Sequence, residues 1–330
     1  MNPSETVIGL LTRGLQCGEP EQSGPLVVVP LFHDGEAVPY RLFAEACLEG
    51  LVAVEEVGAG SVPELVVVNR SGETVLLVEG EMLGGLRQTR TLNTTVLVPA
   101  HATLPIPVSC VEAGRWGVAR PTAREEFHAG PRVRAAKNQG VQEQAREGRG
   151  YRSHQGEVWR MVDGDLAAHG VASPTASYAE LTRRLADPVG EVTAALRPLA
   201  GQRGVLALAG GRPVALDLFD RPETLAVLWR GLVGSYAADA LVAAPGAEGG
   251  PAGDTAALLG ALARGEASTH AGVGLGQVVF LTSPEAVLSA LVVGAAVVHL
   301  AALWSAGTPA AAQEPPEGPA RRPSWFGERR

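Results

Sequence analysis

Short apolar runs dominate the chain from Thr6 to Glu112. They have the length and the Val and Leu content of β-strands, and Gly, Pro, Asn or Asp residues bound them. Only Arg41–Glu49 breaks this series, because its apolar positions have the spacing of a helix. The pattern therefore predicts a sheet with one short inserted helix, with strands at Leu26–Phe32, Leu51–Val54, Leu65–Val68, Val75–Val78 and Val96–Val98.

Helices and a hairpin are predicted after residue 152. Val205–Ala209 and Pro213–Phe219 form a hairpin around Gly210-Gly211. Pro245–Asp254 is rich in Gly and is expected to be a surface loop. The apolar spacing and the capping residues indicate helices at Gln155–Ala168, Tyr178–Leu199, Pro222–Val242 and Thr255–Arg264.

The apolar segment Ala286–Trp304 approaches the length of a membrane-spanning helix. However, Gly294-Ala295 divides it into two Val- and Leu-rich halves, His299 lies inside it, and no basic flank follows. A buried β-hairpin is therefore the preferred interpretation, in which residues 287–293 pair with residues 296–302.

These elements lack the regular alternation of strand and helix that a parallel, doubly wound sheet requires. The sequence predicts an α+β fold with largely antiparallel or mixed sheets, a β-rich N-terminal part, and helices plus hairpins in the C-terminal part. We expect one large domain over residues 1–305, with a β-rich lobe (1–117), an Arg-rich connector (118–152) and a mixed lobe (153–305). Frequent Pro and low hydrophobicity predict a disordered tail at residues 306–330.

Two polar stretches, residues 78–93 and 105–116, interrupt the apolar runs of the first lobe. Glu79 and Glu81 are two positions apart, so on a strand they would share a face as paired carboxylates or as ligands of a hard cation. The alternative is that these side chains form internal ion pairs around a buried turn. Both interpretations give the stretch a specific role.

Hydrogen-bond donors and an aromatic ring complete the candidate site. If Gln88 and Arg90 share a face, charge-assisted hydrogen bonds would hold an anionic or amide-bearing ligand. Glu112 and Arg115 make a recognition pair beside Trp116, whose ring either stacks on a planar group or fills the core. The predicted ligand-binding residues are Glu81, Gln88, Arg90, Asn93, Glu112, Arg115 and Trp116.

The sequence contains none of the common catalytic or metal motifs. Gly80–Gly85 lacks the Gly-Lys-Ser/Thr ending of a phosphate-binding loop, and no Gly-x-Ser-x-Gly motif occurs. Cys17, Cys47 and Cys110 are far apart, without the spacing of a disulfide framework or a zinc site. Cys110 is expected to be an inert, small apolar residue. No catalytic residue, cofactor or metal site is assigned.

Basic residues gather only in the connector, where Arg side chains could bind a phosphate-bearing ligand. The alternative is an exposed linker with a short helix near Ala135–Glu147. The net charge of -8 gives no general attraction to nucleic acid or anionic lipid. Lys137 is the only lysine, which we attribute to a GC-rich codon bias. The first residues lack the basic region of a signal peptide, so a cytoplasmic location is expected.

Six short motifs follow one another along the chain: Gly80-Glu81, Gln88-x-Arg90-x-x-Asn93, Ile106–Trp116, Gln155-x-x-Val158-Trp159, Ser173-Pro174-Thr175 and Ser235–Leu241. They resemble the ARG and rhodanese-phosphatase superfamily-associated protein domain, an uncharacterised prokaryotic family, over about Thr6–Trp304. The resemblance implies a link to ADP-ribosylglycohydrolases and to rhodanese and phosphatase proteins, and so to ADP-ribose- or NAD-linked stress or defence pathways. It implies no catalytic residues.

Three functions remain open from the sequence. The first is a cytoplasmic module that binds a nucleotide-derived or phosphorylated small ligand. The second is a protein-interaction or scaffold module without catalysis, whose partners by family association would be ADP-ribosylglycohydrolase or phosphatase-pathway proteins. The third is a hydrolase that uses Glu81 or Glu112. No membrane partner is expected, and a nucleic-acid partner is disfavoured by the charge.

Overall fold

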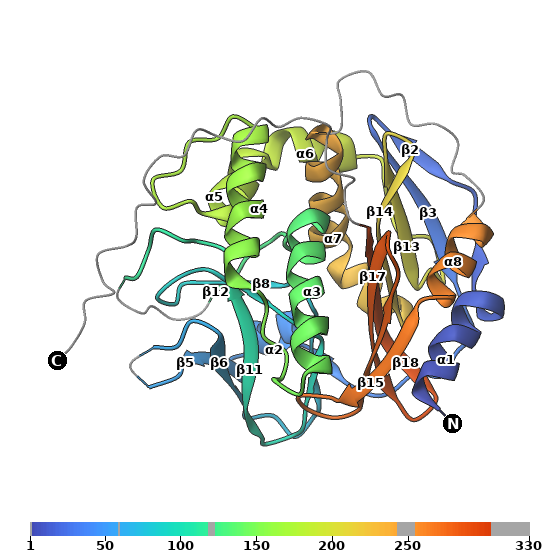
Figure 1. The fold of residues 1–330 in the computed structure, drawn as a ribbon, viewed down its shortest axis with the longest axis horizontal. Coiled ribbons are helices and arrows are strands. Elements are labelled where there is room, and N and C mark those ends of the chain that lie inside the picture. Colours follow the sequence, from blue (N-terminus) through green and yellow to red (C-terminus); the bar gives the residue numbers. More distant parts are fainter. Residues whose placement is uncertain (1, 59, 118–122, 243–254, 305–330) are drawn as a thin grey trace.

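A nine-stranded antiparallel sheet forms the largest layer of the molecule (Figure 1). The computed structural model describes residues 2–58, 60–117, 123–242 and 255–304. The sheet joins distant parts of the chain, because β3 near the N-terminus pairs with β13 and β14 pairs with β18. In spatial order its strands are β1 (Gln16–Cys17), β3 (Leu26–Phe32), β13 (Gly204–Ala209), β14 (Arg212–Phe219), β18 (Ala296–Trp304), β17 (Ala286–Val293), β16 (Gln277–Thr282) and β15 (Glu266–Ala271), and β2 (Glu21–Ser23) pairs with β3.

Apolar side chains cover both faces of this sheet. On β3, Leu26 and Val28 belong to one core cluster, and Val27 and Val29 belong to the other. This follows from the alternation of side chains along a strand, and burial on both faces explains the continuous apolar runs in the sequence. One face packs against α7 (Pro222–Val242) and α3 (Pro131–Arg146), and the other packs against α1 (Pro3–Gly9), the π-helical turn η1 (Leu10–Gly14) and α8 (Thr255–Ala263).

Two smaller sheets carry the polar stretches of the first lobe. In Figure 1, α3 stands between the larger of these two sheets and the nine-stranded sheet. The six-stranded sheet has the order β12 (Ala123–Arg124), β8 (Met82–Gly84), β9 (Arg90–Leu92), β11 (Thr103–Cys110), β6 (Glu64–Asn69) and β5 (Val52–Glu56). The three-stranded sheet has the order β10 (Val96–Val98), β7 (Val75–Leu77) and β4 (Arg41–Leu42), and α2 (Phe43–Leu48) follows β4.

The predicted α+β class is confirmed, and so are most of the predicted elements. β17 and β18 form the buried hairpin predicted for Ala286–Trp304, with a turn at Gly294. The predicted hairpin at residues 205–219 is confirmed as β13 and β14, and α4 (Gln155–Ala168) has the predicted bounds. The predicted loop at residues 245–254 lies outside the described residues, as do residues 306–330.

Two helix predictions were wrong in detail. The helix predicted over Tyr178–Leu199 is two helices, α5 (Tyr178–Arg184) and α6 (Ala186–Thr193), because Pro188 has no N–H to donate to the Arg184 carbonyl. The connector contains the long, largely buried helix α3 instead of an exposed linker. Among the described helices, α7 alone is long and apolar enough to cross a membrane, and 72% of its apolar stretch is buried inside the protein.

Candidate functional site

A network of four buried charges connects the smaller sheets to the large sheet. Arg134 of α3 donates from Nε and Nη2 to the Glu79 carboxylate at 3.0 and 2.7 Å. The same guanidinium donates from Nη1 and Nη2 to Asp217 of β14 at 2.9 and 2.7 Å. Lys137, one turn further along α3, donates to Glu79 Oε1 at 2.5 Å. We call these four side chains the central ion network.

The pKa values in the central ion network favour its charged form. Burial raises the pKa of Glu79, but the charges of Arg134 and Lys137 outweigh this effect and hold that pKa below its usual value. Asp217 is likewise buried, and the neighbouring Arg134 and His299 hold its pKa far below the usual range. Burial lowers the pKa of Lys137 to about 8, against the opposing effect of Glu79. Two cations therefore balance two carboxylates without contact with water.

Lys137 is the only lysine of the chain, and its side chain has no exposed surface. Besides Glu79, its ammonium group donates to the Leu92 carbonyl at 2.9 Å, the Asn93 carbonyl at 3.1 Å and Asn138 Oδ1 at 3.0 Å. A compact ammonium group can distribute its three donors around such a cluster, whereas the planar fork of arginine cannot. This geometry accounts for a lysine at this position better than codon usage does.

The remaining contacts of Asp217 are to a tyrosine and a histidine. Tyr236 of α7 donates to Asp217, and His299 Nε2 lies 3.0 Å from the same carboxylate. The other ring nitrogen of His299 lies 2.7 Å from Thr95 Oγ1, and its ring stacks on Phe219. His299 is thus a core histidine whose two ring nitrogens both have partners.

Gly80 makes the approach of Arg134 possible. Its φ of +88° is a conformation that residues with a Cβ rarely adopt. A Cβ at this position would lie 2.8 Å from Arg134 Nε, which the two carboxylates hold in place. Gly80 of the first polar stretch therefore makes room for the ion network.

Glu79 and Glu81 do not share a carboxylate face: of the two interpretations of this stretch, the structure has the internal ion pairs around a buried turn. Both residues flank a turn at Gly80, not an extended strand. Glu81 is buried and binds Arg124 Nε at 2.7 Å and the Val78 backbone N–H at 2.8 Å. Among the described residues, no group of three or more His, Cys, Asp and Glu side chains could hold a metal ion.

A different set of side chains lines an open pocket of about 410 Å³ between β9, the segment after β11, and α5. Glu112 and Arg115 form an ion pair of 2.8 Å on its wall. Thr89 donates from its backbone N–H and its hydroxyl to the same Glu112 oxygen at 3.0 and 2.9 Å. The Glu112 pocket, as we name it, is lined by Gly85, Thr89, Glu112, Arg115, Gly117, Glu125, Ser177, Ala179 and Arg183.

The pKa values of the two pocket carboxyl groups differ in direction. Burial raises the pKa of Glu112, but the hydrogen bonds from Arg115 and Thr89 outweigh it and leave that pKa below its usual value. Burial raises the pKa of Glu125, and the negative charge of Glu112 adds to the increase, which Arg183 and Arg115 only partly oppose. Glu112 therefore stays ionised, whereas Glu125 binds a proton more readily than an ordinary glutamate.

The other predicted site residues do not line this pocket. Gln88 donates to the Glu112 carbonyl at 3.0 Å, and Asn93 binds Tyr151 and Ser109 deeper in the molecule. Arg90 is fully buried and donates from Nε to the Val62 carbonyl. Trp116 is 43% exposed, with the guanidinium groups of Arg87 and Arg90 at 5.6 and 5.9 Å from its ring. Of the predicted set, only Glu112 and Arg115 line the Glu112 pocket.

Two further acidic residues are buried at the start of α3. Asp165 of α4 pairs with Arg132 at 3.0 Å, and Asp239 of α7 accepts a hydrogen bond of 3.0 Å from the Arg132 backbone N–H. Burial raises the pKa of Asp165 to about 6. Burial and the charge of Asp165 raise the pKa of Asp239 to about 8. This acidic pair holds the start of α3 between α4 and α7.

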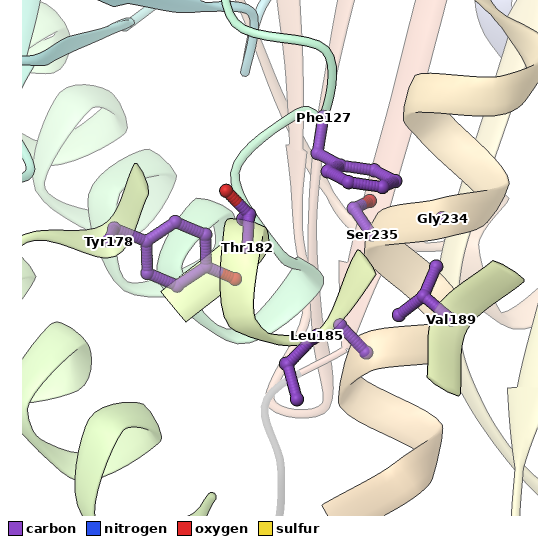
Figure 2. A pocket seen from close by; sticks show the side chains of 8 residues that line it. Phe127, Tyr178, Thr182, Leu185, Val189, Gly234 and Ser235 are labelled. Atoms are coloured by element: carbon purple, nitrogen blue, oxygen red, sulfur yellow. The ribbon is translucent and has the colours of Figure 1, made fainter. Parts of the chain in front are cut away.

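A small cavity between α5, α6 and α7 is too small for a ligand. Figure 2 shows Phe127, Tyr178 and Thr182 around it, together with Val189 and Ser235. Its volume of about 10 Å³ holds a single water molecule at most. The Glu112 pocket is therefore the better candidate for a small molecule.

Sequence reasoning missed Arg134, Asp217 and Tyr236 in the ion network, and Glu125 and Arg183 in the pocket. The signal for α3 was present, because its buried residues recur at helical spacing. Its buried residues alternate small or apolar side chains with four polar ones, Arg134, Lys137, Asn138 and Gln142, so a search for apolar periodicity alone gives a weak signal. Arg183 and Glu125 carry no local signal, since they reach the pocket only through the packing of α5 against the smaller sheet.

Comparison with known proteins identifies the family of the chain. No curated protein and no solved structure matches the chain. The model of one family, described as the ARG and Rhodanese-Phosphatase-superfamily-associated Protein domain, matches residues 14–303. This match covers the strands and helices that build both the central ion network and the Glu112 pocket. The chain therefore belongs to the ARG and Rhodanese-Phosphatase-superfamily-associated Protein domain family.

Proposed function

We propose that the chain binds a nucleotide-derived or phosphorylated small ligand in the Glu112 pocket. The observation that carries this proposal is the presence of two guanidinium groups, Arg115 and Arg183, on the walls of one open pocket. Its volume of about 410 Å³ lies within the range of small-molecule sites, about 300–1,000 Å³. The planar fork of arginine matches the oxygens of a phosphate group.

The two arginines differ in how they are held. Arg115 is fixed by Glu112 and by the Leu86 carbonyl, to which its Nη1 donates at 3.0 Å. Arg183 is exposed on α5 and makes no ion pair with another described residue. A fixed donor reduces the entropy lost on binding, and a guanidinium group outside an ion pair can turn its donors towards a ligand. Both properties favour an anionic ligand.

The family name suggests which anionic ligands to test first. An association with ADP-ribosylglycohydrolases points to ADP-ribose and NAD, both of which carry a diphosphate. On this proposal the protein acts in the cytoplasm as a ligand-binding module of ADP-ribose- or NAD-linked stress or defence pathways. Its partners would then include proteins of the ADP-ribosylglycohydrolase and phosphatase pathways.

Titration calorimetry with ADP-ribose and NAD tests the proposal. We expect the wild-type protein to bind at least one of them and Arg183→Ala to bind it about tenfold more weakly or worse, because a charge-assisted hydrogen bond contributes about 1.5–3 kcal/mol. Arg184→Ala is the matched control, since Arg184 is the next residue of α5 and does not line the pocket. Equal loss in both variants, or none in Arg183→Ala, refutes the assignment of the pocket.

A protein-interaction role is the second candidate, and one surface feature favours it. A groove of about 450 Å³ lies between α6 and α7, lined by Trp229, Pro198 and Val233 among others. Leu199 and Val227, each of which directly follows a lining residue of this groove, are both 44% exposed. Capture of one stable partner that Val227→Asp abolishes, together with no binding of ADP-ribose or NAD, would support this function over the first.

A hydrolase remains the third candidate from the sequence. Glu81 is buried and engaged by Arg124, so Glu112 is the better placed of the two proposed carboxylates. The deciding measurement is whether the protein turns over ADP-ribose or NAD and whether a folded Glu112→Gln variant loses that turnover while Glu81→Gln keeps it.

A further inference from the structure

Four charged side chains line the Glu112 pocket, and two of them already neutralise each other. The Glu112 carboxylate accepts hydrogen bonds from Thr89, from Thr175 Oγ1 at 3.1 Å, and from Arg115. It therefore has little remaining capacity for a ligand. The charges of Glu112 and Arg115 balance, so Glu125 and Arg183 determine the net charge that a ligand meets.

Glu125 is placed to contact a ligand directly. It follows β12, its backbone N–H donates to the Met82 carbonyl, and its side chain faces the pocket. No hydrogen bond or ion pair joins its carboxyl group to another described residue. The group is partly buried, and its pKa is raised by that burial and by Glu112. Its protonated form is thus populated closer to neutral pH than that of a glutamate in water.

The protonation of Glu125 changes the charge of the pocket by one unit. When Glu125 is ionised, the two carboxylates and the two guanidinium groups balance, and the pocket has no net attraction for an anion. When Glu125 is protonated, the pocket carries one positive charge. A neutral carboxyl group can also donate a hydrogen bond to a phosphate oxygen, whereas a carboxylate would repel it.

We propose that Glu125 takes up a proton when a phosphate-bearing ligand enters the Glu112 pocket, so that anion binding and proton uptake are coupled at this side chain. This inference rests on the proposed function and adds a pH-dependent control to it. Glu112 does not share this role, because its hydrogen bonds favour the ionised form. Arg115 and Arg183 remain charged throughout and supply the constant attraction.

The coupling is measured directly in the wild-type protein. ADP-ribose and NAD are suitable probes, because their diphosphate diesters do not titrate near neutral pH. Calorimetry at about pH 7 in two buffers of different ionisation enthalpy gives the number of protons taken up for each ligand bound. We expect net uptake, and an affinity that falls by about tenfold from about pH 5 to about pH 8.

Glu125→Gln identifies the group, because glutamine keeps the size of the side chain and cannot titrate. We expect this variant to bind the probe without proton uptake and with constant affinity across the same pH range. Glu126→Gln is the control, since Glu126 pairs with the exposed Arg230 and does not line the pocket. This control is expected to keep the pH dependence of the wild type.

Each outcome bears on the inference separately from the proposed function. Binding without proton uptake by the wild type refutes the inference and leaves the binding function intact. Proton uptake that persists in Glu125→Gln also refutes it, because another group would then be titrating. A complete absence of binding between about pH 5 and about pH 8 refutes both.

Discussion

Replacing Gly80 with alanine separates backbone strain from displacement of the central ion network. Gly80 and Gly50 both have positive φ, +88° and +70°. A Cβ at Gly50 would meet nothing within 4 Å, whereas a Cβ at Gly80 would lie 2.8 Å from Arg134 Nε. Gly50→Ala therefore has the strain alone, and Gly80→Ala has the strain together with a clash against a buried guanidinium.

The magnitudes of the two effects differ enough to be measured. An alanine in the left-handed region costs about 1–2 kcal/mol. Moving Arg134 away from Glu79 and Asp217 leaves buried charges without their ion-pair partners. Breaking a buried ion pair in this way costs about 3–5 kcal/mol. We expect Gly80→Ala to lower the free energy of unfolding by at least about 3 kcal/mol more than Gly50→Ala does.

Urea unfolding followed by circular dichroism at about pH 7 gives the two midpoints and slopes. With equal slopes, the difference in midpoint reports the clash alone. Equal midpoints for the two variants would refute the argument, because the Arg134 side chain would then have moved without cost. A folded Gly80→Ala variant with low yield can still be compared through its thermal midpoint.

Two further stability predictions follow from buried ionisable groups. Lys137→Arg is expected to lower the free energy of unfolding by about 3 kcal/mol, because the planar guanidinium group of arginine cannot donate to all the acceptors around the Lys137 ammonium group. As a control, the exchange Arg160→Lys at an exposed position should change the urea midpoint little. In the folded protein the pKa of Asp239 is about 8, above the usual value for aspartate. Its contribution to the free energy of unfolding is therefore full below the pKa of the unfolded state and is lost as pH rises through about 8. The stability of Asp239→Asn relative to the wild type should therefore increase between about pH 4 and about pH 8 in thermal unfolding scans, and a constant difference would contradict the raised pKa.

The sequence predicts an element well where apolar residues alone determine it. The β17–β18 hairpin was recognisable because Gly294 interrupts two runs of Val and Leu. α3 was less apparent, although Arg134, Lys137, Asn138, Val141, Gln142 and Ala145 follow helical spacing and are all buried. The period of a helix is the same whether its buried face is apolar or charged. Where a chain also has a stretch of acidic residues, basic and polar residues at helical spacing therefore predict a buried helix as well as apolar residues do.

The candidate site was predictable only in part, for a geometric reason. Glu112 and Arg115 are three residues apart, and their pairing follows from local spacing. Arg183 lines the same pocket, although it is 68 residues further along the chain than Arg115. No local sequence pattern predicts that two residues so far apart in sequence lie in one pocket. The pairing of Glu79 with Arg134 likewise depends on the complete fold, which is why the ion network was anticipated only as an unspecified alternative.

The central ion network also determines when the N-terminal part of the chain can pack during synthesis. Glu79, Arg134 and Lys137 leave the ribosome well before Asp217, Tyr236 and His299, yet all of them share one buried cluster. Before β14 is available, packing of the N-terminal part around Glu79, Arg134 and Lys137 would bury one cation in excess. Burial of an unpaired charge is strongly unfavourable. We therefore expect the nascent N-terminal part to stay loosely packed until residues 217–299 complete the cluster.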